Sequence, residues 1–140
     1  MKIYYCSDLH NDYSGHNALL PYEDKKGILI VAGDINSKGR AVRDLEDIAD
    51  KWHHVIAVPG NHDWWGLALH ETHKFHTTKP NVHILMNETI EIDGIYFTGS
   101  TLWHDIKDNI DAYKWAQTMN DSKKIRGHSY RRLTGINIAS

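Results

Sequence analysis

The stretch Ile28-Leu29-Ile30-Val31-Ala32-Gly33-Asp34 decides how the fold of this chain is interpreted. Its five apolar residues lie between Gly27 and Gly33, and most of them are β-branched. A continuous apolar run of this kind is typical of a strand that is covered on both faces. Asp34 follows the strand directly. Because ligand-binding side chains gather at the carboxyl ends of parallel strands, we expect Asp34 to be a functional residue.

Two further segments repeat this arrangement of a short apolar strand followed by polar residues. The apolar run at residues 3–6 leads into Ser7-Asp8-Leu9-His10. The run at residues 55–58 leads through a proline into Gly60-Asn61-His62-Asp63. Since parallel strands end at the same edge of their sheet, we expect the three polar motifs to meet there.

The side chains of these motifs form a ligand set for divalent metal ions. Residues i and i+2 of an extended segment point the same way, so Asp8 and His10 can bind one ion. The two oxygens of Asp34 can bridge two ions, and Asn61 can offer its amide oxygen to the second. Such ligands suit Mn, Fe, Zn or Ni rather than a cysteine-bound structural zinc. Two ions about 3.5–4 Å apart activate a shared water for attack on a phosphoryl group, and a nearby histidine can stabilise charge on the phosphate or protonate the leaving oxygen.

The composition restricts the class of protein further. The chain has 140 residues and a formal net charge of −2, which gives no overall attraction to nucleic acid or to an anionic membrane. No apolar stretch approaches the roughly 20 residues of a membrane-spanning helix, and acidic residues occur too early for a signal peptide. Cys6 is the only cysteine, which rules out an internal disulfide. We therefore predict a single cytoplasmic domain over residues 1–140, with no membrane partner.

The rest of the pattern predicts an α/β fold. Helical spacing of apolar residues predicts helices at residues 40–52, 67–77 and 108–119. Three short strands are expected between the last two of these helices, at residues 82–86, 89–92 and 95–99. Asp93-Gly94 is a strong hairpin signal between the last two. The first part therefore implies a parallel sheet with helices packed on it, and the later strands imply an antiparallel portion.

In order and in spacing, the three polar motifs resemble those of the calcineurin-like metallophosphoesterases. The resemblance continues to bacterial and phage members through Gly99-Ser100-Thr101-Leu102-Trp103, Met119-Asn120-Asp121 and Tyr130-Arg131-Arg132-Leu133-Thr134. It implies the helix–sheet–sheet–helix sandwich of that family. It also implies a phosphoesterase that hydrolyses phosphomonoesters or phosphodiesters with two divalent metals.

The resemblance assigns a role to each residue of the motifs. By this likeness Asp8 and His10 bind the first metal, Asp34 bridges, Asn61 binds the second, and His62 is the catalytic histidine. Asp63 would anchor the turn or orient His62. Some relatives carry another aspartate three residues after the bridging one, and this chain has Ser37 there.

The chain lacks motifs that the resemblance leads one to expect from the family's second half. Family members run to roughly twice this length, and their second half adds a histidine after a strand and a Gly-His-x-His motif. Gly127-His128-Ser129-Tyr130 lacks the second histidine, and His104 is the other candidate for a substitute ligand. We therefore expect the first half of the sandwich, truncated at its C-terminus. One sheet edge should be exposed where a second half would pair.

Two functions remain open on the sequence. The first is two-metal phosphoester hydrolysis. The second is a catalytically impaired half-domain that binds a partner, either another copy of the chain or a complementary C-terminal half. The basic tail at residues 121–140 leaves a nucleic-acid substrate as a weaker alternative.

The remaining aromatic and imidazole side chains have simpler interpretations. Trp64 and Trp65 are expected to pack or to line the cleft. Solvated positions are expected for a series of histidines, namely His53, His54, His70, His73, His76 and His83.

Overall fold

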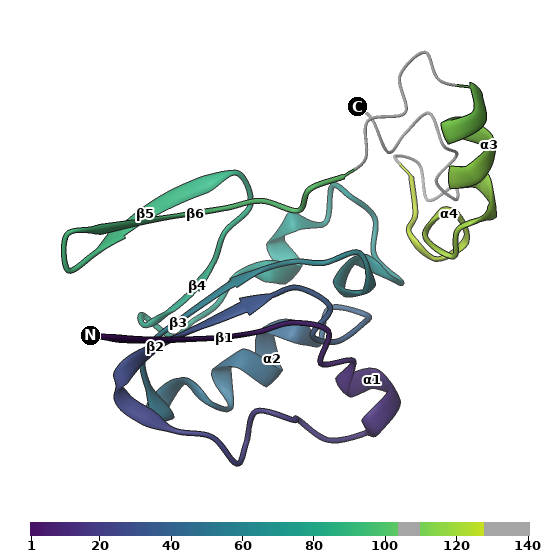
Figure 1. Ribbon diagram of the computed structural model, residues 1–140. Helices are drawn as coiled ribbons and strands as arrows, with labels where there is room; N and C mark the ends of the chain where they lie inside the picture. The colour runs from purple at the N-terminus through teal and green to yellow at the C-terminus, as the bar shows by residue number, and fades with distance from the viewer. Residues whose placement is uncertain (104–109, 128–140) are drawn as a thin grey trace.

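The computed structural model describes residues 1–103 and 110–127. Its parallel sheet has the order β1-β2-β3-β4, formed by Lys2–Cys6, Asp24–Ala32, Trp52–Val58 and Val82–Ile84. The antiparallel hairpin of β5 (Glu88–Ile92) and β6 (Ile95–Gly99) lies over one face of this sheet. Helix α2 (Ala41–Glu46) lies on the other face (Figure 1). The predicted α/β architecture is confirmed.

The remaining elements are short. The loops carry α1 (Asn11–Ser14) and three 3-10 helices, η1 (Ala49–Lys51), η2 (His62–Trp64) and η3 (Thr72–Phe75). Two further helices, α3 (Ile110–Thr118) and α4 (Asp121–Lys124), lie beyond the carboxyl ends of the strands (Figure 1). Within the described ranges, no helix has the length and apolar character that crossing a membrane requires.

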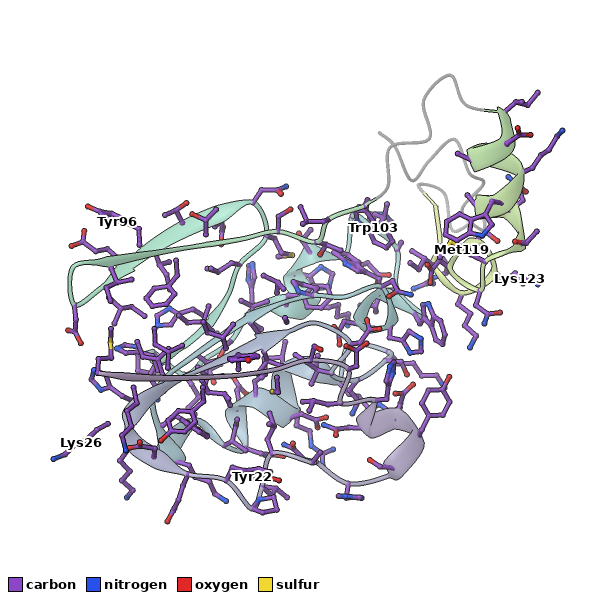
Figure 2. All side chains as sticks on the ribbon, in the orientation of Figure 1. Tyr22, Lys26, Tyr96, Trp103, Met119 and Lys123 are labelled. Atoms are coloured by element: carbon purple, nitrogen blue, oxygen red, sulfur yellow. The ribbon has the colours of Figure 1, made fainter. Side chains whose placement is uncertain are left out.

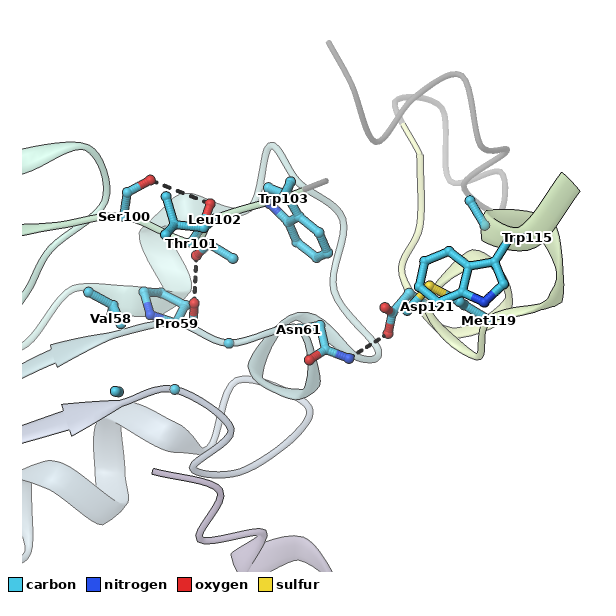
Figure 3. A pocket seen from close by; sticks show the side chains of 14 residues that line it. Val58, Pro59, Asn61, Ser100, Thr101, Leu102, Trp103, Trp115, Met119 and Asp121 are labelled. Atoms are coloured by element: carbon cyan, nitrogen blue, oxygen red, sulfur yellow. Dashed lines mark hydrogen bonds between the residues drawn. The ribbon is translucent and has the colours of Figure 1, made fainter. Parts of the chain in front are cut away.

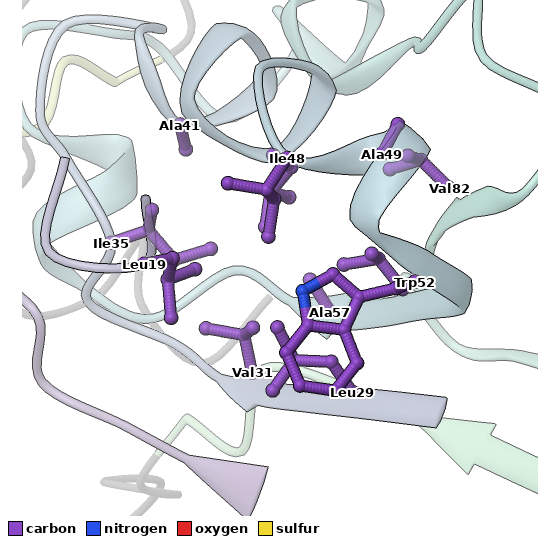
Figure 4. Close-up of a cluster of buried hydrophobic side chains, with 12 residues drawn as sticks. Leu19, Leu29, Val31, Ile35, Ala41, Ile48, Ala49, Trp52, Ala57 and Val82 are labelled. Atoms are coloured by element: carbon purple, nitrogen blue, oxygen red, sulfur yellow. The ribbon is translucent and has the colours of Figure 1, made fainter. Parts of the chain in front are cut away.

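The main core lies between the sheet and α2. Leu29 and Val31 of β2 and Ala57 of β3 point into it, and they meet Ile48 from the segment after α2 (Figure 4). Because side chains alternate along a strand, Ile28 points to the opposite face, where the hairpin covers it. The apolar run of β2 at residues 28–32 is thus covered on both faces, as predicted.

The hairpin leaves the β1 side of its sheet face open. Tyr4 points to the α2 side, where its ring meets that of Trp52 at 5.2 Å between centroids. Its neighbours Ile3 and Tyr5 therefore point to the hairpin side, and they are 46% and 85% exposed. Tyr96 of β6 faces solvent on the hairpin (Figure 2). Among the described residues β1 pairs with β2 alone and β4 with β3 alone, so the sheet has an edge on each side. Which edge a second half would pair with stays a prediction.

A buried polar cluster fixes α1 and α2 beneath the strand ends. One carboxylate oxygen of Asp44 in α2 accepts hydrogen bonds from the side-chain amides of Asn11 at 2.8 Å and Asn36 at 2.7 Å. The amide of Asn17 donates to the backbone oxygen of Asp44 at 2.6 Å. All four side chains are buried. The cluster therefore connects the loops after β1 and β2 to the same helix.

The predicted helix at residues 67–77 is wrong. Only Thr72–Phe75 form a short 3-10 helix. Ala68 instead makes a parallel β-bridge with Arg126, and the backbone N–H of Arg126 donates to the oxygen of Leu67 at 2.8 Å. This contact with a distant segment holds the backbone extended and overrides the local helical spacing.

Two other boundaries differ from prediction for similar reasons. The helix expected at residues 40–52 ends at Glu46, and Trp52 instead begins β3, where it is buried in the main core. The strand at residues 82–86 shortens to β4 and pairs parallel with β3 through Val55↔Val82, so it belongs to the first sheet. The helix at residues 108–119 corresponds to α3 within its described part.

Candidate metal centre

The loops after β1 and β2 run side by side beyond the strand ends. The backbone N–H of Asp8 donates to the oxygen of Gly33 at 3.1 Å, and that of His10 to the oxygen of Asp34 at 2.9 Å. Asp8, His10 and Asp34 have φ angles of 55°, 45° and 55°. Residues other than glycine rarely adopt this left-handed backbone conformation, and backbone strain of this kind is concentrated at functional sites.

Two glycines allow the loops after β2 and β3 to approach. A Cβ atom on Gly33 would lie 2.8 Å from the Cα of Gly60. A Cβ atom on Gly60 would collide with the carboxylate of Asp34. Gly33 also has a φ of 81°. The motifs therefore require glycine at these two positions for close backbone packing.

Asp63 anchors this junction. Its side chain is fully buried, and its two oxygens accept hydrogen bonds from the backbone N–H groups of Asp34, Ile35, Asn36 and Gly60 at 2.8–2.9 Å. Burial raises the pKa of Asp63 to about 6, although these hydrogen bonds act in the opposite direction. Of the two roles considered for Asp63, its contacts favour the anchor of the turn.

The predicted residues Asp8, His10 and Asp34 come together at the strand ends. One possible ligand atom from each lies within 4.8 Å of the others. The Nε2 atom of His10 is 3.9 Å from Oδ1 of Asp8 and 3.9 Å from Oδ2 of Asp34. Two carboxylates and an imidazole at this spacing could hold a divalent metal ion.

A second group shares His10 with the first. Possible ligand atoms of His10, Asp12 and His62 also lie within 4.8 Å of one another. The Nδ1 atoms of both histidines and Oδ1 of Asp12 are buried, and they have no hydrogen-bond partner among the described residues. Buried polar atoms are normally paired, so such atoms mark a place for an ion or water. Asp12 was not predicted as a ligand from the sequence, although Asp12 follows Asp8 and His10 at the same spacing of two residues.

His62 belongs to the second group, and its ring packs between His10 and an indole ring. Its backbone N–H donates to Oδ1 of Asp34 at 3.0 Å. Its imidazole stacks on Trp65 with ring centroids 3.4 Å apart and meets His10 edge-on at 4.4 Å. Burial lowers the pKa of His62, and His10 acts in the same direction while Asp34 opposes it. Without a bound ion, the neutral imidazole is therefore favoured near pH 7.

The amide nitrogen of Asn61 points to α4. Its Nδ2 atom donates to Oδ1 of Asp121 in α4 at 2.9 Å (Figure 3). A cavity of about 480 Å³ adjoins Asn61 and is walled by Pro59, Trp103 and Met119 (Figure 3). This volume lies in the range of small-molecule sites.

The Gly99–Trp103 stretch noted in the sequence contributes Thr101, whose hydroxyl donates to the oxygen of Pro59 at 2.5 Å.

Within the described part of the chain, the other candidate residues are not members of these two ligand groups, although Trp65 stacks on His62. His104 and His128 lie outside the described residues. His70, His73 and His76 are exposed, as expected. Trp64 and Trp65 are buried packing residues, also as expected.

Comparison with known proteins agrees with this arrangement of loops on a parallel sheet. The family model described as the calcineurin-like phosphoesterase superfamily domain matches residues 1–134. The chain belongs to the calcineurin-like phosphoesterase superfamily.

The relatives that this superfamily member matches are longer. Uncharacterized protein L509 of Acanthamoeba polyphaga mimivirus is 29% identical over 155 residues, which are 96% of this chain and 55% of that protein. The symmetrical bis(5'-nucleosyl)-tetraphosphatase of Buchnera aphidicola is 36% identical over 77 residues, which are 50% of this chain and 27% of that enzyme. The chain thus spans about half the length of the mimivirus protein, and the match to the tetraphosphatase covers a smaller share.

A solved structure shows the same fold. The crystal structure of the phosphopantetheinyl hydrolase from Mycobacterium tuberculosis matches with a TM-score of 0.55 at 18% identity. The match covers 92% of this chain and 56% of that one. The expected metallophosphoesterase fold class is therefore confirmed.

Proposed function

We propose that this superfamily member hydrolyses phosphomonoesters or phosphodiesters with two divalent metal ions. The meeting of Asp8, His10 and Asp34 within 4.8 Å carries the proposal, because it supplies a ligand group at the strand ends. The likeness to a protein named as a tetraphosphatase supports the reaction class. A cytoplasmic location stays a prediction.

Four residues would hold the ions. Asp8 and His10 would bind the first, Asp34 would bridge, and Asn61 would offer its amide oxygen to the second. The oxygen and imidazole donors suit Mn, Fe, Zn or Ni. Such ions, when bound, lower the pKa of a water and neutralise charge on the phosphoryl oxygens.

The chain's own groups prepare this chemistry. The N–H of His62 fixes one oxygen of Asp34, and Asp63 fixes the backbone of Asp34. The stack on Trp65 fixes the plane of the His62 imidazole. We infer that this imidazole stabilises the departing group, either by a hydrogen bond from its N–H to a substrate oxygen or, in its protonated form, by donating a proton to that oxygen.

Hydrolysis of p-nitrophenyl phosphate and its bis-ester with added Mn²⁺ tests the proposal. His62→Ala and Asp34→Asn should each lower the rate roughly 100-fold or more, as the loss of a proton donor or a metal ligand does. Matched controls are His73→Ala and Asp50→Asn, because both residues are exposed and lie outside the ligand groups. Equal rates in the wild type and in all four variants would refute the proposal.

The open side of β1 favours a second candidate function. Ile3 and Tyr5 leave apolar surface beside an unpaired strand edge, which is a site for strand addition. A second copy of the chain, or a complementary segment of the kind that completes longer relatives, would fit this edge. Sedimentation velocity of the wild type and Tyr5→Lys would then show association that the substitution removes. Monomers at all concentrations would refute association between copies.

Nucleic acid remains the weaker alternative substrate. Binding through the basic tail would weaken steeply as salt is raised. DNA binding that does not change with salt would argue against it.

A further inference from the structure

The carboxylate of Asp121 connects α4 to the candidate metal centre. Its Oδ1 atom accepts a hydrogen bond from Nδ2 of Asn61 at 2.9 Å and another from Nε1 of Trp65 at 2.6 Å. Asp121 is 3% exposed and Trp65 is 7% exposed, so their contact is shielded from water, whereas the contact with Asn61 is partly buried. A buried carboxylate between two functional neighbours calls for an explanation beyond packing.

We propose that Asp121 is a positioning residue of the phosphoesterase centre, which orients the amide of Asn61 and holds Trp65 against His62. The inference rests on the proposed function, because it assigns Asn61 and His62 the roles given there.

The first part of the argument concerns the two ends of the Asn61 amide. Oδ1 of Asp121 accepts both hydrogen bonds, so the nitrogen end of the Asn61 amide faces Asp121. The oxygen end is then free to bind a metal ion. A reversed amide would present hydrogens, which cannot ligate a cation. Asp121 thus selects the orientation that a ligand needs.

The second part concerns His62. Its ring stacks on Trp65 at 3.4 Å between centroids with an interplanar angle of 28°. Asp121 holds the indole by its N–H edge, and the Nζ atom of Lys124 lies 3.6 Å from the centroid of the same ring. The position of the imidazole therefore depends on an indole that α4 holds at both its edge and its face.

Contacts around α4 fix Asp121 in place. The backbone N–H of Gly66 donates to the oxygen of Lys124 at 2.8 Å, and that of Arg126 donates to the oxygen of Leu67 at 2.8 Å. Ile125 is fully buried among the residues that surround Trp65. Helix α4 therefore packs against the loop that follows the His62 motif. This packing holds the side chain of Asp121 in a fixed position.

Mn²⁺ titration of the full chain by electron paramagnetic resonance tests the proposal, together with separate kcat and KM values for bis-p-nitrophenyl phosphate. Asp121→Leu should weaken Mn²⁺ binding roughly 10- to 100-fold, as loss of a group that orients a ligand does. Asp121→Asn should stay near the wild type, because its amide oxygen can accept both hydrogen bonds. In the NMR spectrum, the indole N–H resonance of Trp65 should move upfield in Asp121→Leu, because its hydrogen bond is lost, and should not move upfield in Asp121→Asn.

An exchange of the two side chains covers the case in which Asp121→Leu does not fold. Asn61→Asp alone sets two carboxylates against each other and should weaken Mn²⁺ binding. Adding Asp121→Asn restores an amide donor facing a carboxylate acceptor, with the partners reversed. The double variant should therefore recover affinity relative to Asn61→Asp.

The outcomes separate this inference from the proposed function. Wild-type protein that binds no Mn²⁺ overturns both. Wild-type protein that binds Mn²⁺, with unchanged affinity in a folded Asp121→Leu variant, overturns the positioning role alone. A double variant that recovers nothing over Asn61→Asp also overturns it.

Discussion

The backbone N–H of Asp34 donates a hydrogen bond to the carboxylate of Asp63 at 2.9 Å, across a sequence separation of 29 residues. The same oxygen of Asp63 accepts the N–H of Gly60 at 2.8 Å. One buried side chain therefore ties the loop after β2 to the loop after β3. The placement of the candidate metal ligands depends on this junction.

Asp63→Ala should destabilise the fold. The substitution leaves four backbone N–H groups without their acceptor, two of them on the buried residues Ile35 and Asn36. The expected loss in the free energy of unfolding is roughly 3 kcal/mol. Urea denaturation followed by circular dichroism measures the change. Asp50→Ala is the control, because the Asp50 side chain is 91% exposed. Coincident unfolding curves for the two variants would contradict the anchoring role.

The polar cluster around Asp44 should behave in the same way. Asp44→Leu removes the acceptor for the amides of Asn11 and Asn36, at an expected cost of about 2–4 kcal/mol. Thermal unfolding should show a lower Tm than for Asp47→Leu, whose side chain is about half exposed. A Tm equal to that of the wild type would show that the cluster contributes little.

The pair His54 and His83 predicts a dependence of stability on pH. Nδ1 of His54 lies 3.0 Å from Nε2 of His83, and burial lowers the pKa of both imidazoles. As the pH falls, the two histidines therefore take up protons in the unfolded chain before they do so in the folded chain. The contribution of the pair is complete above the unfolded pKa of about 6.5, and it is lost as the pH falls through the lower pKa of the folded state.

Urea midpoints at pH 7.5 and pH 5.5 measure this dependence. The double variant His54→Gln/His83→Gln should show a smaller fall between the two values than the wild type. His73→Gln, at an exposed position, should keep the full wild-type fall. If the urea midpoint of the double variant falls as much as that of the wild type, other groups cause the pH dependence.

The parts of the fold that local pattern determines could be predicted from the sequence. The run from Ile28 to Ala32 is apolar on both faces, and the structure covers both faces. The Asp93-Gly94 signal correctly gave the hairpin of β5 and β6. The convergence of Asp8, His10 and Asp34 followed from the rule that parallel strands share a carboxyl edge.

The parts that depend on distant contacts could not be predicted. The pairing of β4 with β3 and the bridge between Ala68 and Arg126 leave no local periodicity in the sequence. Asp121 lies in a tail of weak periodicity, and its role depends on contacts 56 and 60 residues away. The resemblance reached Asp121 as part of a motif but gave it no function.

Mn²⁺ binding tests the central claim that the strand-end motifs form a metal centre. Isothermal titration calorimetry should show Mn²⁺ binding to the wild type and to Asp50→Asn with the same Kd. Asp34→Asn should raise the Kd roughly tenfold or more, because it removes the carboxylate charge from the ligand group. A wild-type chain that binds no Mn²⁺, or an Asp34→Asn variant with an unchanged Kd, would contradict the account.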